Sequence, residues 1–270
     1  MRPKSKLIPK ARARCVAQPT GPRDPYRDPT SLEYRFRRAR FRHIQQMIEA
    51  ILRERRQARI IDLGGTEQYW DIGRDFLDAY RPRIHITLVN PEVFPIRDES
   101  LFASMKGDAT DAKLMEDETF DLAHSNSVIE HVGQMPDMER FAANMARLGQ
   151  RYYMQTPNYW FPLEPHFRVP CFQYLPQAVR VAMLQRMKLG FFRPLPDYDD
   201  ARAVIEHHRL LSMRQVRTLF PDANFEYEWV YGLRKSILAM RRAPVRRDIQ
   251  PPSIAPDDLP KHAGVIRQTA

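Results

Sequence analysis

The chain has 270 residues, a hydrophobic content of 43% and a formal net charge of +10. These values allow one large domain with a full core and basic appendages, and no apolar run approaches the roughly 18 residues of a membrane helix. The basic N-terminus also lacks the apolar segment of a secretory signal, so we expect neither feature.

In chain order, the hydrophobic patterns predict a helix within residues 35–56, a strand at 59–63, a helix at 71–80 and strands at 84–89, 101–106 and 119–124. A helix at 135–148, a strand at 152–155, one helix at 177–188, a helix from Ser212 to near Phe220 and strands at 225–230 and 235–241 follow. Alternating strands and helices predict an α/β fold. We expect a Rossmann-like, doubly wound, mainly parallel seven-stranded sheet with an antiparallel C-terminal hairpin.

Proline-rich segments flank this unit at residues 1–30 and 242–270, and we expect both to be disordered. The first of them is also basic, which leaves open attraction to nucleic acid, anionic lipid or anionic small molecules. A basic tail is usually a solvated segment, so charge alone does not indicate RNA binding. The folded domain is therefore predicted at 31–241, with an insertion at about 157–211.

The two cysteines, Cys15 and Cys171, lie far apart in the chain. They predict no disulfide framework, and the sequence has no metal-ligand spacing, so no metal site is expected. A reducing, cytoplasmic setting is the expected location.

The predicted strand at 59–63 contains Asp62 and is followed by Gly64, Gly65 and Thr66. Glycine lets the backbone pass close to a ligand, and the carboxylate suits a cationic ammonium group better than a pyrophosphate. This favours a sulfonium amino acid such as S-adenosylmethionine. The dinucleotide fingerprint and the phosphate loop are both absent. The alternative is a plain Gly-Gly turn.

Two further strand ends carry polar residues suited to a nucleoside. Asn90 stands where nucleoside-binding α/β folds place an acid for the ribose, with Glu92 as a nearby substitute. Asp108 can accept from an adenine amino group while Ala109 leaves room for the ring. The alternatives are a turn at Asn90 and a helix N-cap after Asp108.

A fourth strand ends in His124, Ser125 and Asn126, which we expect to point into the cleft, and Glu130 and His131 follow at the entry to the next helix. Taken in order, these motifs resemble the class I S-adenosylmethionine-dependent methyltransferases, and are closest to the bacterial subgroup called methyltransferase type 11. The resemblance covers residues 60–157 and continues through 210–241.

The resemblance implies S-adenosylmethionine as cofactor and assigns roles by position. Asp62, Gly64 and Thr66 would line the methionine end, with Gly65 keeping the loop open. Asn90 would meet the ribose, Asp108 and Ala109 the adenine, and Ser125 the neighbourhood of the sulfonium. The chain departs from the family at Thr66, where a glycine is usual, and at Asn90, where an acid is usual.

The segment 156–167 follows the last parallel strand and is rich in proline and aromatic residues, which suits the wall of an apolar acceptor pocket. Within it, Glu164 and His166 are spaced to form a base and its orienting partner, and His131 is the other candidate base. The alternatives are a structural hydrogen-bonding histidine and a helix cap. Aromatic and arginine residues from Phe172 to Arg193 suggest an amphipathic or anionic acceptor, or else a satellite core.

The leading hypothesis is methyl transfer to a small-molecule or lipid- or saccharide-linked acceptor, with peripheral contact to an anionic membrane left open. One alternative is an RNA-binding or RNA-methylating protein, driven by the basic ends. Another is a non-catalytic module that kept the fold and lost the cofactor. The oligomeric state is left open.

Overall fold

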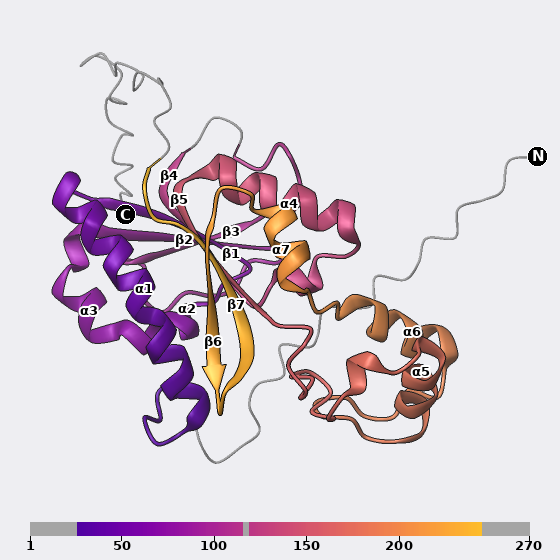
Figure 1. Ribbon diagram of the computed structural model, residues 1–270. Coiled ribbons are helices and arrows are strands. Elements are labelled where there is room, and N and C mark those ends of the chain that lie inside the picture. The colour runs from indigo at the N-terminus through magenta and orange to yellow at the C-terminus, as the bar shows by residue number, and fades with distance from the viewer. Residues whose placement is uncertain (1–25, 116–118, 245–270) are drawn as a thin grey trace, which may run out of the picture.

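The computed structural model describes residues 26–115 and 119–244, and seven strands in this part of the chain form one sheet. The strand order is β3-β2-β1-β4-β5-β7-β6. The strands β1 to β5 are parallel to one another, whereas β7 is antiparallel to both β5 and β6. The predicted α/β fold with its antiparallel C-terminal hairpin is confirmed (Figure 1). The strands span Ala58–Leu63 (β1), Ile84–Asn90 (β2), Phe102–Lys106 (β3), Phe120–Asn126 (β4), Gly149–Pro157 (β5), Asn224–Val230 (β6) and Leu233–Arg241 (β7).

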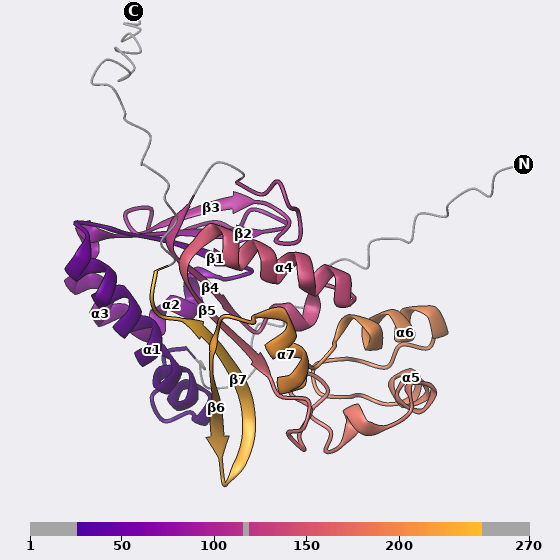
Figure 2. The same cartoon turned by 45° about the horizontal axis from the view of Figure 1, so that its top comes forward.

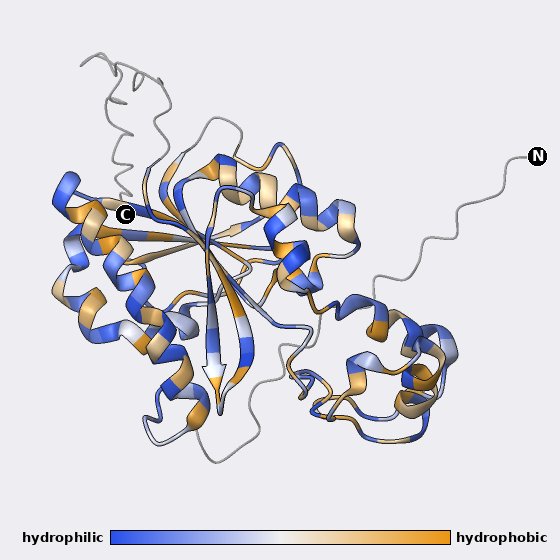
Figure 3. Ribbon diagram, viewed as in Figure 1, coloured by the Kyte–Doolittle hydropathy of each residue, from blue (hydrophilic) through white to orange (hydrophobic). Residues whose placement is uncertain are grey.

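Helices cover both faces of the sheet. On one face lie α1 and α3, on the other lie α4 and α7, and α5 and α6 form a lobe beside the sheet (Figures 1 and 2). The central strands are mainly hydrophobic, whereas β6 and the helices mix hydrophobic and hydrophilic residues (Figure 3). The helices span Leu32–Glu54 (α1), Glu67–Trp70 (α2), Arg74–Ala79 (α3), Met135–Leu148 (α4), Gln177–Arg186 (α5), Tyr198–His207 (α6) and Met213–Leu219 (α7). No helix in the described part of the chain is long and apolar enough to cross a membrane.

The first core lies between α1 and the sheet. Ser31 caps α1, because its side chain accepts a hydrogen bond from the backbone N–H of Tyr34 at 3.0 Å. The buried residues Phe41, Ile44 and Ile48 recur at helical spacing and pack against the strands. α1 thereby buries one face of the sheet.

The prediction of one continuous helix at 71–80 was wrong, because the helical segment begins at Glu67 and is interrupted. The chain turns first as α2, then as a 3-10 turn at Asp71–Gly73, and then as α3. Phe41 of α1 packs closely against this turn, since a Cβ on Gly73 would lie 2.0 Å from its ring.

The second core lies on the other face, under α4. This helix has the predicted bounds, and it begins where the backbone N–H of Gln134 donates to Asp137 at 2.7 Å. Met138, Phe141 and Met145 are buried against the strands. Because this core holds α4 firmly against β4 and β5, it fixes the segment between β4 and α4, which carries Glu130 and His131.

The insertion forms the lobe and has a core of its own, made by Phe167, Phe172, Val181, Leu184 and Phe192 with their neighbours. The expectation of one helix in it was wrong, because α6 follows α5. The side chain of Asp197 caps α6 by accepting from Asp200 N at 2.9 Å. The satellite-core interpretation is confirmed for Phe172 and Phe192, whereas Tyr174 and Phe191 are exposed and the acceptor interpretation stays a prediction.

The described start of the predicted N-terminal tail contacts the domain. Residues 26–30 form turns, and Arg27 pairs with Asp71 at 2.8 Å. Most of the two predicted tails, residues 1–25 and 245–270, lies outside the described residues, and so does Cys15. The described cysteine, Cys171, is exposed and free.

Candidate active site

The predicted cofactor residues lie at or just after the ends of strands that meet at one edge of the sheet. In the parallel register, Leu63 lies beside Val89 and Val89 beside Met105, so β1, β2 and β3 end together. Asp62 lies beside His124 of β4. The loops after these strands therefore meet at the carboxyl edge, where ligands bind in open α/β sheets.

The Gly64-Gly65 loop is fastened to the strands on both sides. The Gly64 N–H donates to the Val89 carbonyl at 2.8 Å, and the Asn90 side-chain amide donates to the Gly65 carbonyl at 2.8 Å. On the other side, the Ser125 hydroxyl donates to the Leu63 carbonyl at 3.0 Å. Gly64 has a φ of +78°, which favours glycine. Its neighbour across the loop is Val128, whose methyl carbons would lie 2.6 Å from a Cβ at Gly64.

Asp62 is fully buried, with both carboxylate oxygens engaged. It accepts a hydrogen bond from Trp70 Nε1 at 2.8 Å, and its other oxygen lies 2.7 Å from His124 Nδ1. A Cβ on Gly65 would lie 1.7 Å from the Asp62 carboxylate, so the carboxylate lies directly against the loop. His124 in turn stacks on Tyr153 with ring centres 5.5 Å apart.

Exposure differs among the other predicted cofactor residues. Asp108 is exposed and Ala109 and Thr66 are half-buried, whereas Asn90 is 6% exposed. Asp108 also accepts from the backbone N–H of Thr110 at 2.8 Å, and no helix follows it before β4 in the described residues, so the alternative of an N-cap after Asp108 is wrong.

The expectation that the end of β4 points into the cleft was wrong for His124 and Ser125. Both side chains are fully buried and bonded to β1, and only Asn126 is half-buried. The next residue, Ser127, has a φ of +55°, a conformation that costs a non-glycine residue energy. The backbone therefore turns sharply from β4 toward Glu130.

Three imidazoles meet next to this edge. The ring centres of His131, His166 and His208 are each 4.8 Å from the other two. They come from the 3-10 turn before α4, the loop after β5 and the end of α6. The Arg209 N–H donates to the Glu130 carbonyl at 2.9 Å, which ties the lobe to the β4 side. We call Glu130 and these three residues the histidine cluster.

The predicted base and its orienting partner lie in contact. His166 Nδ1 is 2.7 Å from Glu164 Oε1, and the other Glu164 oxygen accepts from the backbone N–H of Phe167. Glu130 accepts from the Thr156 hydroxyl at 2.9 Å through Oε2. Its Oε1 atom is buried and has no hydrogen-bond partner among the described residues.

Burial dominates the electrostatics of the cluster. It raises the pKa of Glu130 to about 7 and lowers the pKa of His208 to about 4. Burial, followed by the charge of His166, places the pKa of His131 well below its usual value. For His166 burial acts to lower the pKa, but the hydrogen bond and charge of Glu164 outweigh it, so the net shift is upward.

Glu164 and His208 also line a cavity of about 480 Å³ between the lobe and α4. Aromatic residues, including Tyr159 and Phe172, form part of its wall. Burial lowers the pKa of Arg180 in the same wall, and its Nε atom is buried without a hydrogen-bond partner in the described structure. The cavity therefore combines aromatic wall residues with a guanidinium, that of Arg180, whose Nε has no hydrogen-bond partner among the described residues.

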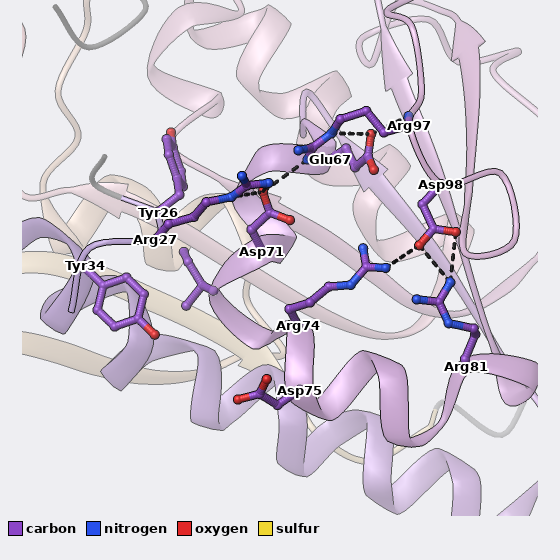
Figure 4. Close-up of a pocket in the computed structure, with 11 residues that line it drawn as sticks. Tyr26, Arg27, Tyr34, Glu67, Asp71, Arg74, Asp75, Arg81, Arg97 and Asp98 are labelled. Carbon is purple, nitrogen blue, oxygen red and sulfur yellow. Dashed lines mark hydrogen bonds and ion pairs between the residues drawn. The ribbon is translucent and has the colours of Figure 1, made fainter. Parts of the chain in front are cut away.

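A larger cavity of about 620 Å³ lies beside α1 and α3 (Figure 4). Most of its charged side chains pair with one another, as Asp98 does with Arg74 and Arg81. None of the predicted site residues lines it. Of these two cavities, the smaller is the one lined by a predicted site residue, Glu164.

The sequence missed two features of this site. His208 was not singled out, although the adjacent pair His207-His208 is visible in the sequence. Trp70 was not recognised as a partner of Asp62, because a distance of eight residues through a bent helical segment carries no simple pattern.

Residues 88–151 match the family model described as a methyltransferase domain. A 53-residue segment is 40% identical to the uncharacterized proteins MT1557 and Rv1509 of Mycobacterium tuberculosis, and covers 20% of this chain and 18% of each of them. An O-methyltransferase family protein from Burkholderia thailandensis is similar in structure, with a TM-score of 0.42 and 15% identity over 78% of this chain and 59% of that one. The N-methyltransferase NodS from Bradyrhizobium japonicum has a TM-score of 0.42 and 13% identity over 78% of this chain and 97% of its own.

The family match runs from the end of β2 to the start of β5, and so includes Asn90, Asp108 and the segment to His131. It does not include the loop after β1. The chain spans less than a fifth of the length of the curated relatives that it matches. The match confirms the resemblance to the class I S-adenosylmethionine-dependent methyltransferases that the motifs predict.

Proposed function

We propose that the chain transfers a methyl group from S-adenosylmethionine to a small-molecule or lipid- or saccharide-linked acceptor. The observation that carries this proposal is the continuity between the two halves of the site. Val128 packs against Gly64 of the proposed cofactor loop, and His131 of the histidine cluster follows three residues later. A cofactor bound at the loop would therefore face the cavity beside the cluster.

On the cofactor side, Gly64, Gly65 and Thr66 would flank the methionine end, with the Asp62 carboxylate attracting the ammonium group from beneath the loop. The Asn90 amide N–H₂ donates to Gly65, which leaves its carbonyl oxygen for a ribose hydroxyl.

At the nucleoside end of the same edge, Asp108 and Ala109 would hold the adenine. Asp108 is exposed and thus available to the adenine amino group. Ser125 would act near the sulfonium through the Leu63 carbonyl that it holds in place.

On the acceptor side, methyl transfer needs the nucleophile, methyl carbon and sulfur in line, and often a base for the acceptor proton. We propose His166, oriented by Glu164, as that base, with His131 as the second candidate. The 2.7 Å contact between His166 and Glu164 supports this assignment.

The acceptor that suits the cavity is amphipathic and anionic. Arg180 offers a half-buried guanidinium, and the exposed rings of Trp160 and Tyr174 lie beside Tyr159 of the cavity wall. The exposed rings would also suit peripheral contact with an anionic membrane. We place this reaction in a reducing, cytoplasmic setting, which the two cysteines favour.

The test is transfer of a labelled methyl group from S-adenosylmethionine into fractionated cell extract. We expect label in the small-molecule or lipid fraction. Label confined to RNA would overturn the acceptor class and favour the RNA-methylating alternative. Absence of label in every fraction would support the non-catalytic alternative.

Two matched pairs of variants sharpen this test. His166→Gln should lower product formation by about 10²–10⁴-fold without changing cofactor affinity, whereas His85→Gln, on the exposed side of β2, should have no effect. Arg180→Gln should raise the KM for the acceptor, whereas Arg186→Gln on the same helix should not. Equal effects within either pair would contradict the assigned role.

A further inference from the structure

We propose that Glu130, His131 and His166 bind a divalent transition-metal ion. One ligand atom from each of the three residues lies within 4.8 Å of those of the other two. Such a group is compact enough to close around one ion with small side-chain rotations. The proposal goes beyond methyl transfer, since metal binding can occur without cofactor or acceptor.

The arrangement of the rings fits a tetrahedral ion. Imidazoles that bind one such ion at about 2.0–2.1 Å have ring centres roughly 5 Å apart. The ring centres of His131, His166 and His208 are 4.8 Å apart in each pairing. The His208 ring borders the group, although its ring nitrogens are not among the ligand atoms that all lie within 4.8 Å of one another.

Outer hydrogen bonds already orient two of the rings as metal sites require. Glu164 holds His166 Nδ1, and the Val204 carbonyl accepts from His208 Nδ1 at 2.7 Å. In each case Nε2 is the ring nitrogen left for a ligand. A carboxylate or carbonyl behind the ligating imidazole is the usual outer contact in metalloproteins.

Glu130 supplies an independent indication. Its side chain is fully buried, and Oε1 has no hydrogen-bond partner among the described residues. A buried polar atom without a partner is costly, and a cation at the cluster would satisfy it. Two histidines and one glutamate form a donor set that zinc takes where one position stays open to water or substrate.

An ion here would border the acceptor cavity, because Glu164 and His208 line its wall. With the ion bound, His166 is a ligand and cannot act as a base. The ion would then lower the pKa of an acceptor hydroxyl that occupies its open position. Chelation therefore distinguishes the two states of the site, since it should abolish metal-assisted activity and leave base-assisted activity intact.

Calorimetric titration of chelator-treated full-length protein with Zn²⁺ tests the site directly. We expect one ion per chain at micromolar concentrations. Glu164→Gln should weaken binding about 10–100-fold, as loss of an outer contact does, and Glu130→Gln should weaken it further. His85→Asn is the matched control and should bind as the native protein does.

A spectroscopic measurement on the native protein keeps the test independent of variant folding. Co²⁺ should give the visible absorption of a four- or five-coordinate site with imidazole ligands. Absence of both Zn²⁺ and Co²⁺ binding would overturn the proposal, and so would binding that Glu130→Gln and Glu164→Gln leave unchanged. Either failure leaves the methyl-transfer proposal standing, because labelled transfer is measured separately.

Discussion

The Asp62 carboxylate and the His124 imidazole lie 2.7 Å apart, and both side chains are fully buried. Trp70 donates to the second carboxylate oxygen, so the acid at the end of β1 belongs to a polar network within the fold. The same carboxylate lies directly against Gly65. This network therefore shapes the proposed cofactor loop from below, and its loss should affect stability as well as binding.

Asp62→Ala should lower the free energy of unfolding by about 2–6 kcal/mol, because two buried donors each lose a partner at about 1–3 kcal/mol. Urea unfolding of the native and variant proteins measures the change. A loss below about 1 kcal/mol would show that the network contributes little. Binding data on this variant therefore need a stability measurement beside them.

Gly64→Ala should cost more stability than Gly232→Ala, although the two glycines have almost the same φ, +78° and +77°. Alanine at either position carries the left-handed cost of about 1–2 kcal/mol. At Gly64 a Cβ also meets Val128, which adds about 1–3 kcal/mol of overpacking, whereas nothing lies within 4 Å at Gly232. Denaturant unfolding compares them.

A double variant separates these two causes. Gly64→Ala combined with Val128→Ala should recover most of the overpacking cost and keep the backbone cost. An additive double variant would contradict the contact between Gly64 and Val128.

Glu228 should make the fold sensitive to acid. Burial acts to raise its pKa, but Arg40 of α1 at 2.6 Å, Lys235 at 3.2 Å and the Ser236 hydroxyl outweigh it, so its pKa is lowered from 4.5. Tyr153 of β5 also faces this group. A lowered pKa in the folded state contributes stability that is complete above pH 4.5 and is lost as the pH falls toward the folded value.

Glu228→Gln should therefore flatten the stability profile below about pH 5 and cost on the order of 3 kcal/mol at neutral pH. Glu226→Gln on the same strand is the control, because its side chain is 46% exposed and pairs only at the surface with Arg242 and His43. It should cost less than about 1 kcal/mol. Thermal unfolding across the pH range measures the stability profiles. Equal profiles for Glu228→Gln and Glu226→Gln would contradict the role of Glu228 in acid sensitivity.

Periodic and local features of the fold could be predicted from the sequence. The bounds of α4 agree with the prediction, and the seven strands lie within about three residues of their expected positions, because alternation and helical spacing are local signals. The helix α6 was missed, although Asp197 is its N-cap, because the sequence analysis expected one helix in this aromatic segment.

The site was less predictable, because its contacts join distant segments. Glu164 and His166 are two residues apart, and their pairing followed from spacing. The meeting of His131 with His166 and His208 depends on how the lobe packs beside β4, which no local pattern encodes. The expectation of no metal site rested on the absence of a short metal-ligand spacing, and our metal proposal departs from it.

The central claim is that S-adenosylmethionine binds at the carboxyl edge of the sheet, and isothermal titration with S-adenosylhomocysteine tests it. Asp108→Ala and Asp111→Ala form a matched pair, since both side chains are exposed and each accepts a backbone N–H two residues later. We predict that the native protein and Asp111→Ala bind with equal affinity, and that Asp108→Ala binds at least about 10-fold more weakly, a loss of 1.4 kcal/mol. A native protein that binds no ligand, or equal affinities for all three proteins, would contradict the claim.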